Sequence, residues 1–326
     1  DQLLGLQGPD TAQPELWTKQ IEAAKDNANT SPLYEFQQLR GLQGDSLGAR
    51  WKELQDEWKA AKLKEDNFFA QDLGQRWDLG DPQQAAEWVK TGNGSLHEVS
   101  APGMFSVLVD GDQIIDNIHE GGIYTHGLST RHNGILQSPE FPVDFEKMWF
   151  RYSGVGGVRG RPAVENYPRV LGLLYNGNEP KGITPQWQQH DMVFFTNNSV
   201  HFELATAYDL PIERKSNDRS WWGITDFVVT KEGQQAPSAT PNRLAALYPG
   251  EITSQDSIIK AYRDTLKAAI RAWTNNTLND QQARFLGFFV RSNLLPNQLS
   301  DNSEIAALVN QYRAIDQTLP IPTRVP

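Results

Sequence analysis

The spacing of apolar residues along this chain changes its period twice. In residues 1–67, apolar side chains recur every three or four positions, which is the period of an amphipathic helix. Pro14 and Asp45 fall where helices typically begin. We therefore predict an N-terminal helical segment over residues 1–67, whose stripe packs on the chain's own helices or, alternatively, docks another protein. The longest stripe consists of Leu47, Trp51, Leu54, Trp58 and Ala61.

Residues 68–235 consist of short apolar runs separated by Gly, Pro, Asn and Asp. Residues 105–109 alternate between apolar and polar, and Asp110-Gly111 then gives a hairpin turn signal. No helical pattern separates the runs, which argues against a parallel α/β sheet and predicts an antiparallel β-sandwich, specifically a jelly roll. Further strands are expected at 148–152, 170–175, 192–195, 200–206 and 224–230.

The helical period returns in residues 236–326. Ser254 is placed to cap one helix, Asp280 to start a second, and Asp301 with Glu304 to begin a third. Neither helical segment alone has enough apolar surface for a core, so we expect the two to meet in one helical subdomain beside the sandwich. The predicted fold class is mainly β plus α.

Composition narrows the functional classes. The 326 residues carry a net charge of −10, which argues against a nucleic-acid-binding surface, because phosphate contacts need clustered Lys and Arg. No apolar run approaches the ~18 residues of a membrane span, and no signal peptide is recognisable. The absence of cysteine excludes disulfides, thiolate metal sites and covalent haem attachment within these residues. Since the chain begins at Asp1 and ends in LPIPTRVP, we expect it to be a segment of a longer polypeptide.

The candidate chemistry lies in one glycine-rich stretch, residues 114–167. It holds three of the six histidines, and strand-like runs bracket it, so its polar side chains should lie on loops held by a β scaffold. An aromatic face stacks on a sugar ring, and the planar guanidinium of arginine suits carboxylates, sulfates and sugar diols. The candidate ligand-binding residues are Tyr124, His126, Arg131, His132, Arg159, Arg161 and Tyr167.

These residues also have a purely structural interpretation. The histidines would then bond to the backbone, the aromatic rings would lie in the core, and the arginines would pair with Glu165, Asp144 or Asp218. The sequence has no H-E-x-x-H pattern for zinc and no G-x-S-x-G elbow for a nucleophilic serine.

Calcium is the one cofactor that the sequence suggests. Jelly-roll binding modules often tie their first and last strands with Ca²⁺, a hard ion that takes six to eight oxygen ligands. Asp72 and Asp226 lie at the matching ends of the predicted sandwich, and Asp78 is near. We therefore expect a structural Ca²⁺ at Asp72 and Asp226.

Three segments together resemble a known family: GGIYTHGLSTRHNGILQSPEF, VENY, and ELATAYDLPIERKSNDRSWWGITDFVV. They are similar to the middle region of large planctomycete-type proteins that carry a cytochrome-c-like domain and two family-specific domains of unknown function. The resemblance covers residues 68–326. It implies an extracytoplasmic protein, periplasmic or at the cell surface, whose haem lies outside this segment and whose neighbouring domains are partners. It implies no particular activity.

A second resemblance is to the galactose-binding-like sandwiches of carbohydrate-binding modules. It rests on residues 69–73, on S-P-x-F, and on a last strand ending W-G-I-T-D-F-V-V. The function predicted from the sequence is therefore a non-catalytic module that binds polysaccharide. Two alternatives stay open: a polysaccharide lyase with Tyr124 or His126 as base and an arginine on the uronate carboxylate, and a structural spacer between domains.

Overall fold

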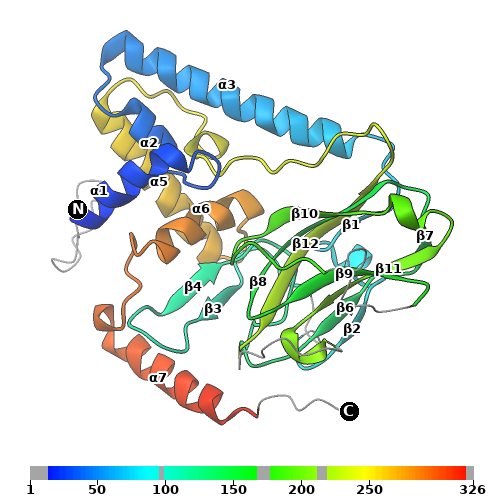
Figure 1. Cartoon of the computed structure of the whole chain (residues 1–326). Helices are drawn as coiled ribbons and strands as arrows, with labels where there is room; N and C mark the ends of the chain where they lie inside the picture. Colours follow the sequence, from blue (N-terminus) through cyan, green and yellow to red (C-terminus); the bar gives the residue numbers. More distant parts are fainter. Residues whose placement is uncertain (1–13, 95–98, 167–176, 211–218, 321–326) are drawn as a thin grey trace.

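The computed structural model describes residues 14–94, 99–166, 177–210 and 219–320. Helices from both ends of the chain gather on one side, and most strands form a β-sandwich on the other (Figure 1). A separate hairpin of β3 (Phe105–Val107) and β4 (Ile115–Ile118) lies beside the sandwich. No helix within the described ranges is long and apolar enough to cross a membrane.

The first sheet of the sandwich is centred on β12 (Trp221–Thr230). One edge of β12 pairs with β8 (Lys147–Val155), and the other edge pairs with β1 (Arg76–Asp78) and β5 (Ile123–Tyr124). The polar strand β10 (Gln186–Asp191) extends the sheet beyond β8. All of these pairings are antiparallel.

The second sheet is centred on β11 (Ser199–Ala205). Its neighbours are β9 (Arg159–Val164) on one edge and β6 (Ile135–Gln137) with β7 (Phe141–Pro142) on the other. The short strand β2 (Val89–Thr91) pairs with β6. These pairings are antiparallel as well.

Aromatic side chains fill the space between the two sheets. Phe150 on β8 and Phe202 on β11 are fully buried, with ring centroids 4.6 Å apart. Phe227 packs on the Trp88 ring at 5.4 Å. Each such side chain contributes roughly 1.5–3 kcal/mol when it leaves water. The antiparallel sandwich flanked by helices that the sequence predicts is confirmed.

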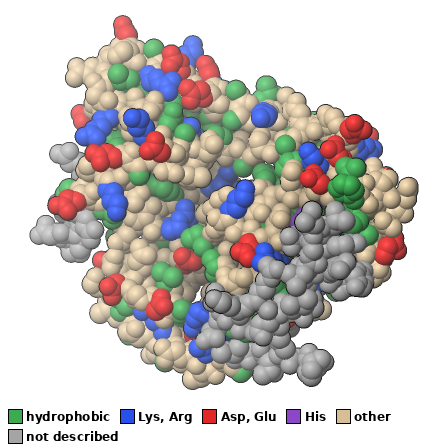
Figure 2. Space-filling view, viewed as in Figure 1, with side chains coloured by type: hydrophobic (Ala, Val, Ile, Leu, Met, Phe, Trp, Pro, Cys, Tyr) green, Lys and Arg blue, Asp and Glu red, His purple; other side chains and the backbone are tan. Residues whose placement is uncertain are grey.

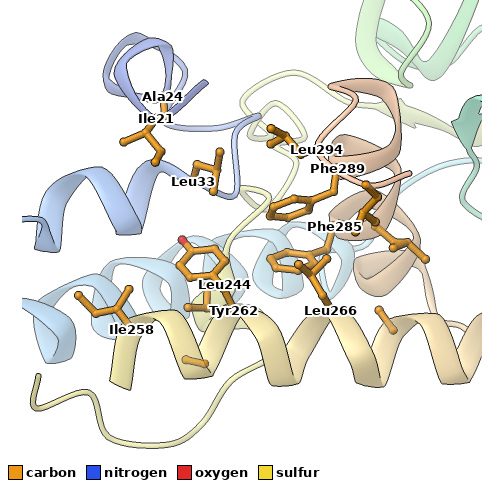
Figure 3. Packing of buried hydrophobic residues seen from close by; sticks show 14 of the residues in the cluster. Ile21, Ala24, Leu33, Leu244, Ile258, Tyr262, Leu266, Phe285, Phe289 and Leu294 are labelled. Carbon is orange, nitrogen blue, oxygen red and sulfur yellow. The ribbon is translucent and has the colours of Figure 1, made fainter. Parts of the chain in front are cut away.

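The helices of the two flanks share one hydrophobic core. In Figure 3, Ile21 and Leu33 from the N-terminal flank lie with Tyr262, Phe285 and Phe289 from the C-terminal flank. The predicted stripe on the longest N-terminal helix is buried at Leu47, Trp51 and Leu54, inside this same core. The helices are α1 (Pro14–Ala23), α2 (Tyr34–Leu39), α3 (Gly44–Phe69), α5 (Gln255–Thr274) and α6 (Asp280–Arg291).

One carboxylate links the two flanks inside this core. Glu35 on α2 is fully buried and accepts hydrogen bonds from the backbone N–H groups of Leu244 (2.5 Å) and Ala245 (3.1 Å). Burial raises the pKa of Glu35 to about 7. The Tyr262 hydroxyl donates to the Pro32 carbonyl at 2.6 Å, so the core also holds polar links between chain segments far apart in sequence.

Helix α6 packs directly on strand β4. A Cβ atom at Gly287 would lie 2.8 Å from Asn117 Oδ1 and 2.8 Å from the Ile118 carbonyl oxygen. Only glycine therefore allows this approach of helix and strand backbones. The contact fixes α6 relative to the segment that leads from β4 into β5.

The last helix, α7 (Ser303–Thr318), fastens the β3–β4 hairpin. Arg313 donates from Nε to the Leu108 carbonyl at 2.8 Å and from Nη1 to the Gly111 carbonyl at 2.9 Å. Near the end of α7, the buried Asp316 accepts from Ser129 Oγ at 2.5 Å and pairs with Arg219. The remaining short elements are α4 (Pro82–Ala85), η1 (Ala24–Asp26), η3 (Ala207–Asp209), η4 (Leu244–Ala246) and η5 (Leu299–Asp301).

Two local predictions from the sequence are wrong, and a third falls outside the described residues. The strand expected at 192–195 is wrong, because this segment is the 3-10 turn η2 (Val193–Phe195), which leaves Phe194 77% exposed. The third C-terminal helix is capped by Asn302, whose side chain accepts from Glu304 and Ile305, and not by Asp301. The strand expected at 170–175 lies outside the described residues.

Candidate ligand-binding site

A cavity of about 400 Å³ lies where the helices meet the outer face of the first sheet. The sheet contributes residues of β8 and β10, and the helical side contributes α6, the end of β4 and the segment that leads from β12 back to the helices. Its volume falls within the range of roughly 300–1,000 Å³ that is usual for small-ligand sites. The residues that line it include Asn117, His119, Glu120, Arg151, Trp187, Thr240, Arg284 and Arg291.

Strand register brings the sheet residues of the cavity into one row. Trp187 on β10 is the direct partner of Arg151 on β8, and Arg151 is the partner of Asp226 on β12. Asp226 in turn lies opposite Asp78 on β1. Because directly paired residues project to the same face, these side chains share the outer face of the sheet.

Arg151 is held by two carboxylates. Its Nη2 donates to both oxygens of Glu120 at 2.9 and 2.8 Å, and its Nη1 lies 3.5 Å from Asp226 Oδ2. The Arg151 and Glu120 side chains are only 12% and 5% exposed. Charge-assisted, two-point bonds of this kind fix a guanidinium in one orientation. The Arg151 Nε is buried and has no hydrogen-bond partner among the described residues.

Arg284 on α6 extends this network to the helices. Its Nε lies 3.3 Å from Glu120 Oε1 and its Nη1 donates to the Thr240 carbonyl at 3.0 Å. Thr240 belongs to the connecting segment, which also bonds to α3 through Glu65. Hydrogen bonds and ion pairs therefore connect the wall of the cavity to the first sheet, to α6 and to the connecting segment.

Arg291, the last residue of α6, is the third arginine of the cavity. Its Nη1 donates to Asn117 Oδ1 at 2.7 Å. Within the described ranges it forms no ion pair, in contrast to Arg151 and Arg284. Burial lowers its pKa, and Asp116 opposes that shift from a distance. Arg291 and Thr30 also border a smaller cavity of about 160 Å³ between α6 and the N-terminal helices.

A buried histidine pair stands at the inner end of the cavity. His119 follows β4 and lines the cavity, and its Nε2 lies 3.3 Å from both His126 Nε2 and Ser106 Oγ. Burial, reinforced by the charge of Arg291, lowers the pKa of His119 to about 3. The ring of His126 stacks on Trp221 with centroids 3.7 Å apart, and burial lowers its pKa well below 6.5. Both rings are therefore neutral near pH 7.

Of the ligand residues predicted from the sequence, two belong to this histidine cluster without lining the cavity. Tyr124 is 4% exposed, lies 4.8 Å from the His119 ring, and donates its hydroxyl to the Glu120 carbonyl at 3.0 Å. Its ring occupies the space that a Cβ at Gly223 would take, so the two strands close over it. His126 is 2% exposed. Both residues support the cavity from behind.

The predicted arginines lie elsewhere and serve the fold. Arg131 donates from Nη1 to the carbonyls of Gln317 and Leu319 at 2.8 and 2.9 Å, at the end of α7. Arg159 pairs with Glu179, and the buried Arg161 pairs with Glu203 across β9 and β11.

The last two predicted ligand residues do not join the cavity either. His132 is half-buried next to Arg131, and its backbone N–H bonds to the Ser129 carbonyl at 3.2 Å. Tyr167 lies outside the described residues. The structure thus does not gather the predicted set into one site.

The predicted calcium ligands are also apart. Asp226 is engaged by Arg151 and by Thr225 Oγ1 at 2.7 Å. Asp72 precedes β1. Its backbone carbonyl accepts a hydrogen bond from the side chain of Gln234, which follows the C-terminal end of β12. Among the described residues, no group of three or more His, Asp or Glu is arranged to hold a metal ion. A calcium site at Asp72 and Asp226 stays a prediction.

Sequence reasoning missed the residues that line the cavity, although two signals were present. Arg151 is a charge inside an otherwise apolar strand run, and buried arginine needs partners. Arg284 and Arg291 are seven residues apart, which places them on one face of α6. On the face of the molecule shown in Figure 2, Lys, Arg, Asp and Glu side chains are interspersed over the helices.

Three solved structures have low similarity to this chain in both sequence and fold. A CBM61 carbohydrate-binding module in complex with β-1,4-galactotriose has 13% identity and a TM-score of 0.25, covering 44% of this chain and 88% of its own. CBM35 from Paenibacillus barcinonensis has 13% identity and a TM-score of 0.26, covering 49% and 100%. The K1 cleaved adhesin domain of Lys-gingipain from Porphyromonas gingivalis W83 has 17% identity and a TM-score of 0.25, covering 45% and 92%. No protein-family model matches the sequence. No curated protein matches it either.

Proposed function

We propose that this protein is a non-catalytic glycan-binding module and that the glycan enters the cavity between α6 and the first sheet. The observation that carries this proposal is the lining of that cavity. It combines a half-buried tryptophan with many neutral amide and hydroxyl side chains and a few fixed charges. Such a mixture suits a sugar, which presents one apolar C–H face and many hydroxyl groups.

Trp187 supplies the aromatic surface. It lies on the edge strand β10, half-buried, with its ring 6.4 Å from that of Phe69 at the end of α3. The polar partners for hydroxyl groups surround it on several elements. They are Asn29, Thr30, Asn117, Thr184, Gln186, Ser238, Thr240 and Asn242.

The lyase alternative draws no support from the two bases first considered. Tyr124 and His126 are almost fully buried and neither lines the cavity. A general base must reach the proton that it removes, directly or through one water molecule. Binding without chemistry is thus the function that the described geometry favours.

Two wider expectations belong to the proposal. We place the module in a larger extracytoplasmic protein, with its haem and family-specific domains outside these residues, on the strength of the sequence resemblance. We also keep a structural Ca²⁺ at Asp72 and Asp226 as a prediction. A chelator that lowers the melting temperature would support that ion, and an unchanged melting temperature would contradict it.

The test is a glycan-array screen of the purified segment, followed by calorimetric titration of the best ligands. Trp187→Ala should weaken binding by about tenfold or more, in line with loss of a stacking aromatic side chain at a hot spot. Trp149→Ala is the matched control, because Trp149 lies on the neighbouring strand, is also half-buried and does not line the cavity. If no glycan binds, or if both variants lose affinity equally, the proposal is wrong.

A further inference from the structure

We infer that the glycan bound in this cavity is acidic, with its carboxylate or sulfate group held by Arg291. This inference rests on the proposed function and specifies its ligand. It comes from the distribution of charges around the cavity, which differs from that of the whole protein. The chain has a net charge of −10, yet the charged residues lining the cavity are Arg151, Arg284, Arg291 and Glu120.

Two of the three arginines are already neutralised by the protein. Arg151 is bonded at two points to Glu120 and also pairs with Asp226. Arg284 shares Glu120 and bonds to Thr240. These two residues build the wall of the cavity and hold its shape.

Arg291 differs because it has a neutral partner, the Asn117 amide oxygen. Arg291 is half-buried, and Asp116 acts on it only from a distance, without an ion pair. A cation that is partly removed from water and not paired costs free energy, and that cost falls when an anion binds. Its position at the C-terminus of α6, where the helix dipole favours a positive charge, offsets part of the cost. A ligand anion gives a stronger, charge-assisted hydrogen bond than an amide does.

His119 provides a second, independent indication of a ligand group at the same place. It is 1% exposed, and its Nδ1 has no hydrogen-bond partner among the described residues. Its Nε2 is occupied by Ser106 and His126. When Ser106 or His126 donates to Nε2, the ring proton lies on Nδ1, which is then a buried donor that an oxygen of a bound ligand would satisfy. A neutral imidazole N–H and a guanidinium both suit the oxygens of an acidic sugar.

The inference can be tested by titrating three trisaccharides at equal ionic strength: a galacturonic acid trimer, a sulfated galactose trimer and neutral galactotriose. The wild type should bind one or both acidic ligands at least about tenfold more tightly than the neutral one. The comparison between the two acidic arms identifies the anionic group. Arg291→Gln should remove the preference, because it should lower the affinity for the acidic ligands by a larger factor than the affinity for the neutral one. Arg263→Gln, at a half-buried site on α5 beside Asp264, is the matched control.

Equal affinity for acidic and neutral ligands would overturn the acidic assignment and leave the proposed function standing. Binding of none of the three, with an empty glycan array, would overturn both. If Arg291→Gln does not fold, the inference is tested by how the ligand affinity of the wild type depends on salt. Affinity for the acidic ligand should fall as NaCl rises while affinity for galactotriose stays constant, and parallel behaviour of the two would contradict the inference.

Discussion

The imidazoles of His119 and His126 meet nitrogen to nitrogen, with their Nε2 atoms 3.3 Å apart and both side chains buried. Only one proton can lie between the two nitrogens, so a charge on either ring is costly. The pair is held from both sides, since Trp221 stacks on His126 and Tyr124 packs against His119. The stability of this end of the cavity should therefore decrease at acidic pH, where the histidines would take up protons.

We expect the free energy of unfolding to depend on these histidines between about pH 3 and 6.5. Their pKa values are lowered in the folded state, to about 3 for His119, so the unfolded chain binds more protons in this window. Stability therefore rises with pH, is complete above 6.5, and is lost as pH falls toward 3. The slope is on the order of 1.4 kcal/mol per pH unit for each histidine that titrates.

The measurement is urea unfolding of wild type and His126→Asn from pH 4.5 to 8. The variant should be less stable at pH 8 and show a flatter profile. Glu35 titrates in the same window with the opposite sign, because its pKa is raised to about 7, but its contribution is the same in both proteins. His201→Asn is the control, because burial also lowers the pKa of His201 but this side chain is only half-buried and nearby Glu203 and Glu140 oppose the shift, so the effect on the profile should be smaller. Parallel profiles for wild type and His126→Asn would contradict the account.

The buried pair of Arg161 and Glu203 should behave as a structural ion pair. The two side chains are 3% and 8% exposed, and Gln137 also donates to Glu203 at 3.1 Å. Arg161→Met alone should cost about 3–5 kcal/mol, because it leaves a buried carboxylate without its cation. Arg161→Met with Glu203→Leu should recover most of that loss, because apolar pairs of similar size often replace buried ion pairs without net cost.

Chemical denaturation of the single and double variants measures this coupling. Arg159→Met is the matched control on the same strand, because its partner Glu179 is 58% exposed and such pairs contribute about 0–1 kcal/mol. Glycan affinity should stay unchanged in all three variants. If Arg161→Met loses glycan affinity without losing stability, Arg161 contacts the ligand and the structural interpretation is wrong.

Gly287 should tolerate no side chain. Alanine there would place a methyl group 2.8 Å from the β4 backbone and push α6 away, at a cost of about 1–3 kcal/mol, and it would widen the cavity. Gly48→Ala in α3 offers the opposite case, since its nearest neighbour would be the Ile252 carbonyl at 3.9 Å. That variant should gain up to about 1 kcal/mol from helix propensity. Melting curves compare the two, and equal effects would refute this explanation of the α6–β4 contact.

Much of the fold could be predicted from the sequence, because burial imposes a period on apolar residues. The period of two separates the sandwich from the flanks, and capping residues such as Ser254 mark helix starts. Strand β10 could not be found this way. Its residues Gln186 to Asp191 are mostly polar, since it is an edge strand whose outer face meets the cavity.

The candidate site was harder to predict, because its residues are distant in sequence and come together only when α6 packs beside the sheet. Arg151 and Arg284 are brought together by their shared partner Glu120, and no local pattern reveals this. The dense polar stretch 114–167 contains residues that line the cavity, such as His119, but these were not among the predicted ligand residues. It also drew attention to Arg131 and Arg161, which hold α7 and the second sheet. The presence of an arginine in the sequence does not show whether its side chain contacts a ligand or forms hydrogen bonds and ion pairs within the protein.

The most direct test of a glycan site between α6 and the sheet is ¹⁹F NMR of protein labelled with 5-fluorotryptophan. Trp187→Phe assigns the resonance of Trp187, and Trp149→Phe assigns the neighbouring control. On titration with the galacturonic acid trimer and with galactotriose, the Trp187 resonance should shift with saturation while that of Trp149 stays in place. A saturating shift at Trp149 with none at Trp187, or no shift at either, would contradict the location of the site.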